Sequence, residues 1–372
     1  MKGTFDFPSC GIGLNRANLT MKKSTVSNFS KGAAVLFVDK EHTVKLLNSK
    51  FNFNSLVGIQ ILGDSLSPLI ESCTIEKNDC SGIQVCTGNK CNIRKNEINN
   101  NQTGIEIISS DPYIYENKIS KNYQEGVRTK TLEDLVCKPI LHSNEITSNC
   151  LSGIYCSGIN NCTKILNNSM VSYNKGPGIK IENEAHVLIT KNNIYKNIMQ
   201  GVLVIERSSA HIESNNIKDN IKANLAFGGE NSCNTVVLNN KIFGGRAEGI
   251  FIVEGGRAYI HNNDIHGNFD GIICLSSFPE MYGNQIDNNK SNGLMILKDA
   301  QPTVINNLIQ NNSGIGIVVK DRSRGIYLNN ILKDNDLDMY IDSKWDEYGS
   351  VRSENKISGE IRISRDKKCV VF

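Results

Sequence analysis

Three aspartates in the second half of the chain, Asp264, Asp270 and Asp287, come closest to a catalytic set by residue type and spacing. Hydrolysis of a glycosidic bond requires two carboxyl groups held at a defined separation. His266 lies near these aspartates in the register of the repeat described below. No adjacent pair of aspartates completes the set, because the next repeat has Ser291-Asn-Gly at the corresponding place. An aspartate in such a turn can instead cap backbone N–H groups, so catalysis by this set is the weaker interpretation.

Metal and cofactor chemistry finds no support in the sequence. The twelve cysteines include no Cys-x-x-Cys pair, and the histidines are scattered over polar turns and strand edges, without the clustering of a metal site. We therefore expect no metal and no cofactor. The N-terminal residues lack the apolar stretch of a signal peptide, and no run of about 18 apolar residues occurs. These features predict a cytoplasmic protein with reduced cysteines.

The overall composition excludes one class of partner and favours an extended shape. The chain has 372 residues, with 41 basic and 38 acidic side chains and a formal charge of +3. General binding of nucleic acid needs a basic surface, which this balance argues against. The hydrophobic share of 39% is below the usual globular value. It predicts a thin core and many turns.

A repeat runs through most of the chain and must position any site. Its first anchor is the glycine of Gly-(Ile/Val/Leu)-x-(hydrophobic), and successive anchors are 22 to 27 residues apart, with one gap of 48 that holds two copies. Ala223-Asn-Leu225 occupies the place of the missing glycine. A second anchor, Asn-x-(Ile/Leu)-x-x-Asn, keeps step with the first from Asn96 to Asn330.

Each repeat carries three short runs of alternating apolar residues, separated by Gly, Asn, Asp or Ser. This pattern predicts strand, turn, strand, turn, strand. Strands this short in a repeat of about 23 residues pair with the same strand of the next repeat. The sequence therefore predicts an all-β, right-handed parallel β-helix of three sheets. We expect irregular coils over 1–57, regular repeats over 58–335, C-terminal coils or a cap over 336–364, and a basic tail over 365–372.

The recurring asparagines and glycines have a physical explanation in this fold. Asparagine tolerates the left-handed backbone of a tight bend, and stacked asparagines can bond to one another from coil to coil. Glycine before the first strand indicates a corner with little room. The alternation predicts that isoleucines point inward and stack on their counterparts.

The stretch from Gly104 to Asn122 resembles the β-helix repeats of pectin-degrading enzymes, periplasmic sugar-related proteins and eukaryotic recognition proteins. Among the last group, it is most similar to the β-helix of F-box-only ubiquitin-ligase receptors and SHC-binding β-helix proteins. The similarity covers roughly residues 58–335. In the F-box receptors the β-helix is expected to hold the substrate, although this chain has no leucine-rich helical F-box segment.

The resemblance also supplies the motifs that an enzyme of this fold should carry. Hydrolases gather three aspartates near a Gly-His-Gly, and lyases gather acidic calcium ligands with an arginine base. Asn268-Phe-Asp270-Gly271 resembles the hydrolase Asn-Thr-Asp-Gly, but Gly-His-Gly is absent from the sequence. We therefore expect a chain without enzymatic activity.

The residues expected to face outward from the first strand of each repeat change character along the chain. They are mixed and polar in the first half, and become apolar in the second half, at Leu203, Ile205, Phe251, Val253, Ile273, Leu275, Met295, Leu297 and Val318. Apolar bands of this size on soluble proteins usually bind a partner or are covered. Partner binding is the first interpretation. The alternatives are a covering segment of the same chain, or an error in the assumed register.

A smaller polar cluster is expected in the first half, made of Arg128, Lys130, Tyr155 and Lys180. It could hold an acidic peptide or a sugar, although such clusters are commonly solvated surface. The repeat between Gly126 and Gly153 contains an excursion over residues 130–138. Extra loops on one side of a solenoid often border a binding face.

The chain ends in Cys369-Val-Val-Phe, preceded by basic residues. This matches a prenylation signal with Cys369 as the modified residue, and one lipid chain with a few lysines would suffice for membrane attachment. The alternative is a last β-strand. The sequence thus predicts a non-enzymatic scaffold that binds partner proteins, resembling a ubiquitin-ligase recognition module and attached to a membrane if Cys369 is prenylated. The alternative is a carbohydrate-binding or carbohydrate-active β-helix.

Overall fold

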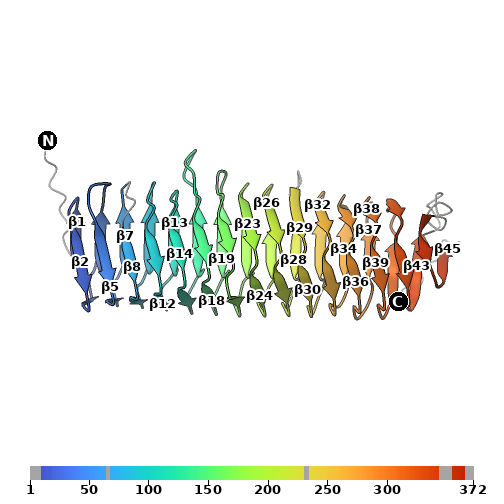
Figure 1. Cartoon of the computed structure of the whole chain (residues 1–372), viewed down its shortest axis with the longest axis horizontal. Coiled ribbons are helices and arrows are strands. Elements are labelled where there is room, and N and C mark those ends of the chain that lie inside the picture. Colours follow the sequence, from blue (N-terminus) through green and yellow to red (C-terminus); the bar gives the residue numbers. More distant parts are fainter. Residues whose placement is uncertain (1–9, 64–67, 230–233, 343–353, 365–372) are drawn as a thin grey trace. The chain divides into compact units, whose positions relative to one another are not determined.

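The computed structural model describes residues 10–63, 68–229, 234–342 and 354–364, and the regular elements defined there are β-strands (Figure 1). The chain divides into two compact units, residues 1–199 and 200–372. The sequence had suggested boundaries near residues 57 and 335, which stay predictions. Within the described ranges, no helix has the length and apolar character needed to cross a bilayer.

Unit 1 (residues 1–199) repeats a three-strand coil, and each strand belongs to one of three parallel sheets. The strands of sheet A in this unit are β1 (Ile12–Asn15), β4 (Ala34–Phe37), β7 (Ile59–Leu62), β10 (Ile83–Cys86), β13 (Ile105–Ile108), β16 (Val127–Lys130), β19 (Ile154–Ser157) and β22 (Ile179–Glu182). Those of sheet B are β2 (Leu19–Lys22), β5 (Val44–Leu47), β8 (Leu69–Glu71), β11 (Asn92–Arg94), β14 (Tyr113–Tyr115), β17 (Ile140–His142), β20 (Lys164–Leu166) and β23 (His186–Thr190). Those of sheet C are β3 (Thr25–Ser27), β6 (Lys50–Asn52), β9 (Thr74–Glu76), β12 (Glu97–Asn99), β15 (Lys118–Ser120), β18 (Glu145–Thr147), β21 (Met170–Ser172) and β24 (Asn193–Tyr195).

Unit 2 (residues 200–372) follows the same plan. Its sheet A strands are β25 (Val202–Val204), β28 (Leu225–Gly228), β31 (Ile250–Val253), β34 (Ile272–Leu275), β37 (Leu294–Leu297), β40 (Ile315–Val319), β43 (Leu337–Asp342) and β45 (Ile361–Ser364). Its sheet B strands are β26 (Ser209–Glu213), β29 (Asn234–Leu238), β32 (Arg257–His261), β35 (Glu280–Tyr282), β38 (Thr303–Ile305) and β41 (Ile326–Leu328). Its sheet C strands are β27 (Asn216–Lys218), β30 (Lys241–Phe243), β33 (Asp264–His266), β36 (Gln285–Asp287), β39 (Leu308–Gln310), β42 (Ile331–Lys333) and β44 (Lys356–Ile357).

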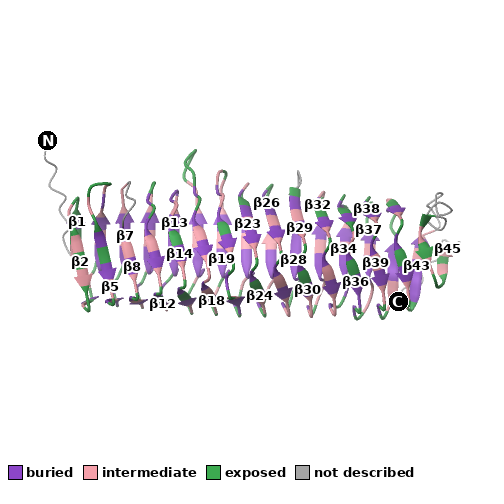
Figure 2. Cartoon of the chain, viewed as in Figure 1, coloured by how far each residue is buried: buried purple, intermediate pink, exposed green. Residues whose placement is uncertain are grey.

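Like strands lie beside like strands in register, which confirms the predicted three-sheet parallel β-helix of about 23 residues per coil. Ile105 of β13 pairs with Ile83 of β10 on one side and with Val127 of β16 on the other. All three side chains are fully buried. In Figure 2 the buried positions recur along the strands of the coils between the two ends. Each buried aliphatic side chain contributes roughly 1.5–3 kcal/mol, and this stacking is the main source of cohesion.

Two asparagine ladders line the turns of each coil. At the turn between sheets B and C, the Nδ2 of Asn96 donates to Asn117 Oδ1 at 2.9 Å, and the backbone N of Asn96 donates to the same oxygen at 3.0 Å. Asn117 repeats both bonds with Asn144. A second ladder occupies the turn between sheets C and A, where Asn101 bonds to Asn122 in the same way. The expected bonding between coils is therefore present.

The backbone at these turns differs from the expectation in one respect. The left-handed residue is the one that precedes the ladder asparagine, such as Lys95 at a φ of 56° and Glu116 at 56°. The ladder asparagines themselves do not have positive φ. Their role is hydrogen bonding: each side chain is buried and satisfies backbone groups of two coils. The preceding residue is exposed or half-buried, so its type varies although its conformation is strained.

One coil of unit 2 exchanges the two anchor residues. Gly245 stands where a ladder asparagine is expected, and Asn224 stands where the corner glycine is expected. Asn224 fills the gap in the ladder, because its Oδ1 accepts from Asn220 Nδ2 at 2.8 Å and its Nδ2 donates to Asn268 Oδ1 at 2.9 Å. A Cβ on Gly245 would lie 2.9 Å from Asn224 Nδ2. Each of these two residues therefore requires the other.

We predict that Asn224→Gly lowers the free energy of unfolding by about 3 kcal/mol, because buried groups of two neighbouring asparagines lose their partner. Gly245→Asn alone should also destabilise the fold, since the new side chain competes for filled space. The double variant restores the arrangement of the other coils, so its loss of stability should be smaller than the sum of the two single losses by more than about 1 kcal/mol. Urea unfolding of the wild type, the two single variants and the double variant measures this coupling. Purely additive losses of stability would contradict it.

Candidate functional site

One row of outward side chains on sheet A of unit 1 is polar from β7 to β22, and we call it the polar column. Its members pair in register from coil to coil and are Gln60, Gln84, Glu106, Arg128, Tyr155 and Lys180. The column lies on β7, β10, β13, β16, β19 and β22. Adjacent members are separated by the distance between paired strands, roughly 4.8 Å. This length is comparable with that of one sugar ring.

Glu106 is the centre of the column and is only 8% exposed. Its Oε2 accepts from Gln84 Nε2 at 2.8 Å, and its Oε1 accepts from Lys130 Nζ at 2.9 Å. Gln84 in turn accepts from Gln60 Nε2 at 2.7 Å. Burial raises the pKa of Glu106, but hydrogen bonds from Lys130 and Gln84, with the charges of Lys130 and Arg128, outweigh it and lower the pKa overall. Glu106 is therefore a carboxylate at neutral pH.

Arg128 is fixed by residues that lead into its own strand. Its Nη2 donates to Glu125 Oε2 at 2.6 Å and to Gln124 Oε1 at 2.8 Å. Its Nη1 lies 3.9 Å from Glu106 Oε1. The guanidinium is thus clamped between two carboxylates with part of its surface open, and it can donate further hydrogen bonds to a ligand.

Tyr155, Glu182 and Lys180 form the other end of the column. The phenol of Tyr155 donates to Glu182 Oε1 at 2.6 Å, and Lys180 Nζ lies 2.6 Å from Glu182 Oε2. The ammonium of Lys180 also lies 5.6 Å from the centre of the Tyr155 ring. Burial, followed by the hydrogen bond to Glu182, raises the pKa of Tyr155 to about 12. The phenol therefore keeps its proton at neutral pH and can act as a donor.

The site is polar but electrically balanced. Arg128, Lys130 and Lys180 are matched by Glu106, Glu125 and Glu182. Sequence reasoning brought together the three cations and Tyr155, and the structure places all four on one face of sheet A. It did not assign roles to the glutamates or to Gln84. Their outward position was readable from the alternation, but their shared bonds with the cations were not.

The three aspartates lie on two different parts of the coil in unit 2. Asp264 and Asp287 are on adjacent strands of sheet C, and Asp287 pairs in register with His266. Asp270 lies in the turn before β34, where its Oδ1 accepts from the backbone N of Asn292 at 2.9 Å and from Asn292 Nδ2 at 3.0 Å. These bonds fit a turn cap. Among the described residues, no three histidine, cysteine or acidic side chains are placed to hold a metal ion.

The apolar band lies on sheet A of unit 2, in the expected register. Phe251 pairs with Ile273, Ile273 with Met295, and Met295 with Val318. Its other members, Leu203, Ile205, Val253, Leu275 and Leu297, are half-buried, as are Phe251, Ile273 and Met295. Val318 differs, since it is only 2% exposed and offers no contact surface. Cys369, the predicted lipidation site, lies outside the described residues.

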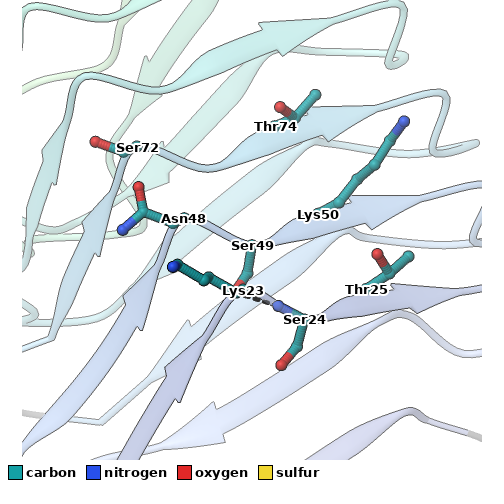
Figure 3. Close-up of a pocket in the computed structure, with 8 residues that line it drawn as sticks. All are labelled: Lys23, Ser24, Thr25, Asn48, Ser49, Lys50, Ser72 and Thr74. Atoms are coloured by element: carbon teal, nitrogen blue, oxygen red, sulfur yellow. Dashed lines mark hydrogen bonds between the residues drawn. The ribbon is translucent and has the colours of Figure 1, made fainter.

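A shallow groove at the turn between sheets B and C of unit 1 was not predicted from the sequence. It is lined by hydroxyl, amide and amine groups of Lys23, Ser24, Thr25, Asn48, Ser49, Lys50, Ser72 and Thr74 (Figure 3). The backbone N of Ser24 donates to Ser49 Oγ at 3.2 Å across it. Lys50 already pairs with Glu76 at 2.8 Å, so this groove holds less uncompensated charge than its two lysines suggest.

Comparison with known proteins places the fold among β-helix proteins. The family model described as "Right handed beta helix region" matches residues 10–170, 136–279 and 226–365. No curated protein matches the sequence of the chain. The solved structure of the periplasmic alginate epimerase AlgG is 12% identical, with a TM-score of 0.55 over 82% of this chain and 77% of that one. The mannuronan C-5 epimerase AlgE6 A-module of Azotobacter vinelandii is 12% identical, with a TM-score of 0.39 over 92% and 90% of the two chains.

This likeness corrects two expectations. The prediction of a chain without enzymatic activity is wrong, because the fold is matched by an epimerase. That prediction was based only on the incomplete hydrolase and lyase motifs, and epimerisation is a different reaction. The predicted cytoplasmic location is also wrong, since the matched epimerase is periplasmic. The similarity to F-box receptors and the expected link to a ubiquitin ligase receive no support from these comparisons.

We predict that Phe251→Asp and Met295→Asp leave the fold intact, because both side chains face outward and surface changes usually alter stability by less than about 0.5 kcal/mol. Ile252→Asp, on the same strand as Phe251 but facing inward, should prevent folding. Circular dichroism with thermal unfolding distinguishes the three. If the two outward variants also fail to fold, the band is internal packing and not an open surface.

Proposed function

Because the chain belongs to the right-handed β-helix family, we propose that it binds a polysaccharide along the polar column of unit 1 and acts on it there. The observation that carries this proposal is the unbroken row of hydrogen-bonding side chains from Gln60 to Lys180, one for each coil. Its regular spacing suits a polymer of repeating units. Sugar-active enzymes with this fold, such as the alginate epimerase, support the same reading.

The contacts already formed by the column determine how a sugar would bind. Arg128 holds Gln124 and Glu125 on one side, and its open surface can bond sugar hydroxyls. Glu106 is nearly buried with both oxygens bonded, so its role is to position the side chains around it. The ring of Tyr155 adds a flat apolar surface. Since the cations are matched by carboxylates, binding should depend on directed hydrogen bonds more than on attraction between net charges.

The chemical step that these residues suit is proton transfer. Tyr155 keeps its proton at neutral pH, and its oxygen is held in place by the hydrogen bond to Glu182, which in turn pairs with Lys180. A positioned phenol is an established type of general acid. The proposal assigns Tyr155 as the proton donor to a bound sugar, with the phenol turning its proton from Glu182 to the sugar oxygen. Asp270 is not assigned this role because its bonds to Asn292 fit a turn cap.

We predict that Arg128→Ala weakens polysaccharide binding about 10-fold or more, because a charge-assisted hydrogen bond is worth roughly 1.5–3 kcal/mol. Lys118→Ala, an exposed change on sheet C, is the control and should have no effect. A glycan array followed by calorimetry measures both. The affinity of the wild type should change little between low and moderate salt. A steep fall with salt, or equal affinities for the two variants, would contradict the proposal.

Measurements of turnover distinguish the two candidate catalytic groups, which are Tyr155 on the polar column and Asp270 among the three aspartates. With alginate and pectin as substrates, cleavage by elimination is followed by the absorbance of unsaturated products and epimerisation by proton NMR. Cleavage of xylan is followed by the release of reducing ends. Tyr155→Phe should reduce turnover by at least about 100-fold, the usual contribution of a general acid, and leave binding within a few-fold of wild type. Asp270→Asn should keep most of the activity. The reverse order of effects would assign catalysis to the aspartates.

A second function, recognition of a partner protein, is favoured by the apolar band of unit 2. Its half-buried side chains lie in register on adjacent strands, which gives a flat apolar surface of the kind that proteins contact. Loss of a co-purifying protein from Phe251→Asp, with folding retained, would support it. Pull-down of the same proteins by the variant would dismiss it. Prenylation of Cys369 remains a prediction that mass spectrometry of the C-terminal peptide can test.

A further inference from the structure

An apolar lip borders the polar column. After β16 ends at Lys130, the chain leaves the sheet over residues 131–138 and forms the excursion that extends past its neighbours near β13 and β19 in Figure 1. Three of its side chains are exposed aliphatics: Leu132 at 46%, Leu135 at 48% and Val136 at 42%. Ile159 of the next coil is 51% exposed. We call these four residues the apolar lip.

Hydrogen bonds hold the lip in a defined conformation. The backbone N of Leu132 donates to Ser109 Oγ at 2.8 Å, and the N of Cys137 donates to Asn160 O at 3.2 Å. Asn160 Nδ2 returns a bond to Asp134 O at 3.4 Å. The two excursions of adjacent coils are thus tied together. The aliphatic side chains are presented by an anchored turn, which keeps the entropic cost of a ligand contact low.

The lip lies next to the column in both coils that form it. Lys130, which bonds to Glu106, immediately precedes residue 131. Its register partner Ser157 precedes the turn that carries Ile159. A polymer lying on the column beside Arg128 and Tyr155 therefore has the lip along one of its edges. Sugar hydroxyls make no hydrogen bond with four aliphatic side chains, but methyl groups pack against them.

We propose that the lip selects polysaccharides that carry apolar substituents, such as O-acetyl groups or the methyl groups of deoxy sugars. This inference rests on the proposed function of the polar column. An anionic membrane surface fits the lip less well, because Glu133 and Asp134 at its tip are exposed and carry negative charge. The same two carboxylates disfavour a highly charged polyanion, so the lip fits best a polymer of low charge with scattered methyl groups.

The test uses alginate, xylan and pectin, each in an O-acetylated form and after alkaline removal of the acetyl groups. Binding is measured by calorimetry for the wild type and for a variant carrying Leu135→Ser and Ile159→Ser. Both changed residues are exposed, so the fold should be retained, and thermal unfolding verifies this. The wild type should bind the acetylated form of at least one polymer more tightly, by about fourfold for each methyl group buried. The variant should lose that preference and keep the wild-type affinity for the deacetylated form.

Three results would overturn the inference in distinguishable ways. Equal binding of both forms by the wild type rejects the role of the lip and leaves the polar column as the site. Failure of every polymer to bind rejects the column and the lip together. Binding of the wild type to vesicles of phosphatidylcholine with phosphatidylserine, lost in the Leu135→Ser and Ile159→Ser variant, assigns the lip to a membrane.

Discussion

The rest of the structure depends on the fixed register between coils, and two interactions establish it. Stacked aliphatic side chains give the coils their cohesion, but such contacts alone allow slippage. The asparagine ladders remove that freedom. The side-chain oxygen of each ladder asparagine accepts two hydrogen bonds from the asparagine in the neighbouring coil, one from its backbone N and one from its side-chain amide. Asn144 accepts both from Asn117. A shift of one residue would break both bonds in every coil and leave buried polar groups without partners. Register is thereby specified turn by turn.

Fixed register converts a repeat in sequence into a surface. In unit 1 it places Gln84, Glu106 and Arg128 side by side, so that Gln84 bonds to Glu106 across coils and Arg128 lies near Glu106 while bonding within its own coil. In unit 2 the same geometry aligns Phe251, Ile273 and Met295. One backbone plan therefore presents a hydrogen-bonding face in one unit and an apolar face in the other. The composition of the outward positions, which the core does not constrain, decides which face is made.

The exchange of Asn224 and Gly245 shows how strictly this plan is kept. The coil lacks a ladder asparagine at its proper place, yet the ladder is continuous because a side chain from the glycine corner reaches into the gap. The corner has room for that side chain only because Gly245 has none. Preservation of the ladder at the expense of the usual anchor residues indicates that the hydrogen bonds are the stronger requirement.

The period-two alternation in each strand was sufficient to predict the fold and to separate inward from outward residues. By itself it assigned Arg128, Tyr155 and Lys180 to one face of the β-helix. It could not show that Glu106 is almost buried, because that burial comes from long side chains of adjacent coils. Nor could it locate the left-handed residues that precede each ladder asparagine, since Lys95 and Glu116 have no distinctive type. The exposed aliphatics of residues 131–138 read as ordinary apolar residues in the sequence.

The central claim is that the polar column of unit 1 is where a polysaccharide binds. A crystal structure of the chain with an oligosaccharide of the polymer that binds it most tightly tests this claim most directly. The account predicts sugar rings lying across Glu106, Arg128 and Tyr155, with hydroxyls bonded to Arg128. Sugar density on sheet C beside Asp264 and Asp287, or over the apolar band, with the polar column empty, would contradict it.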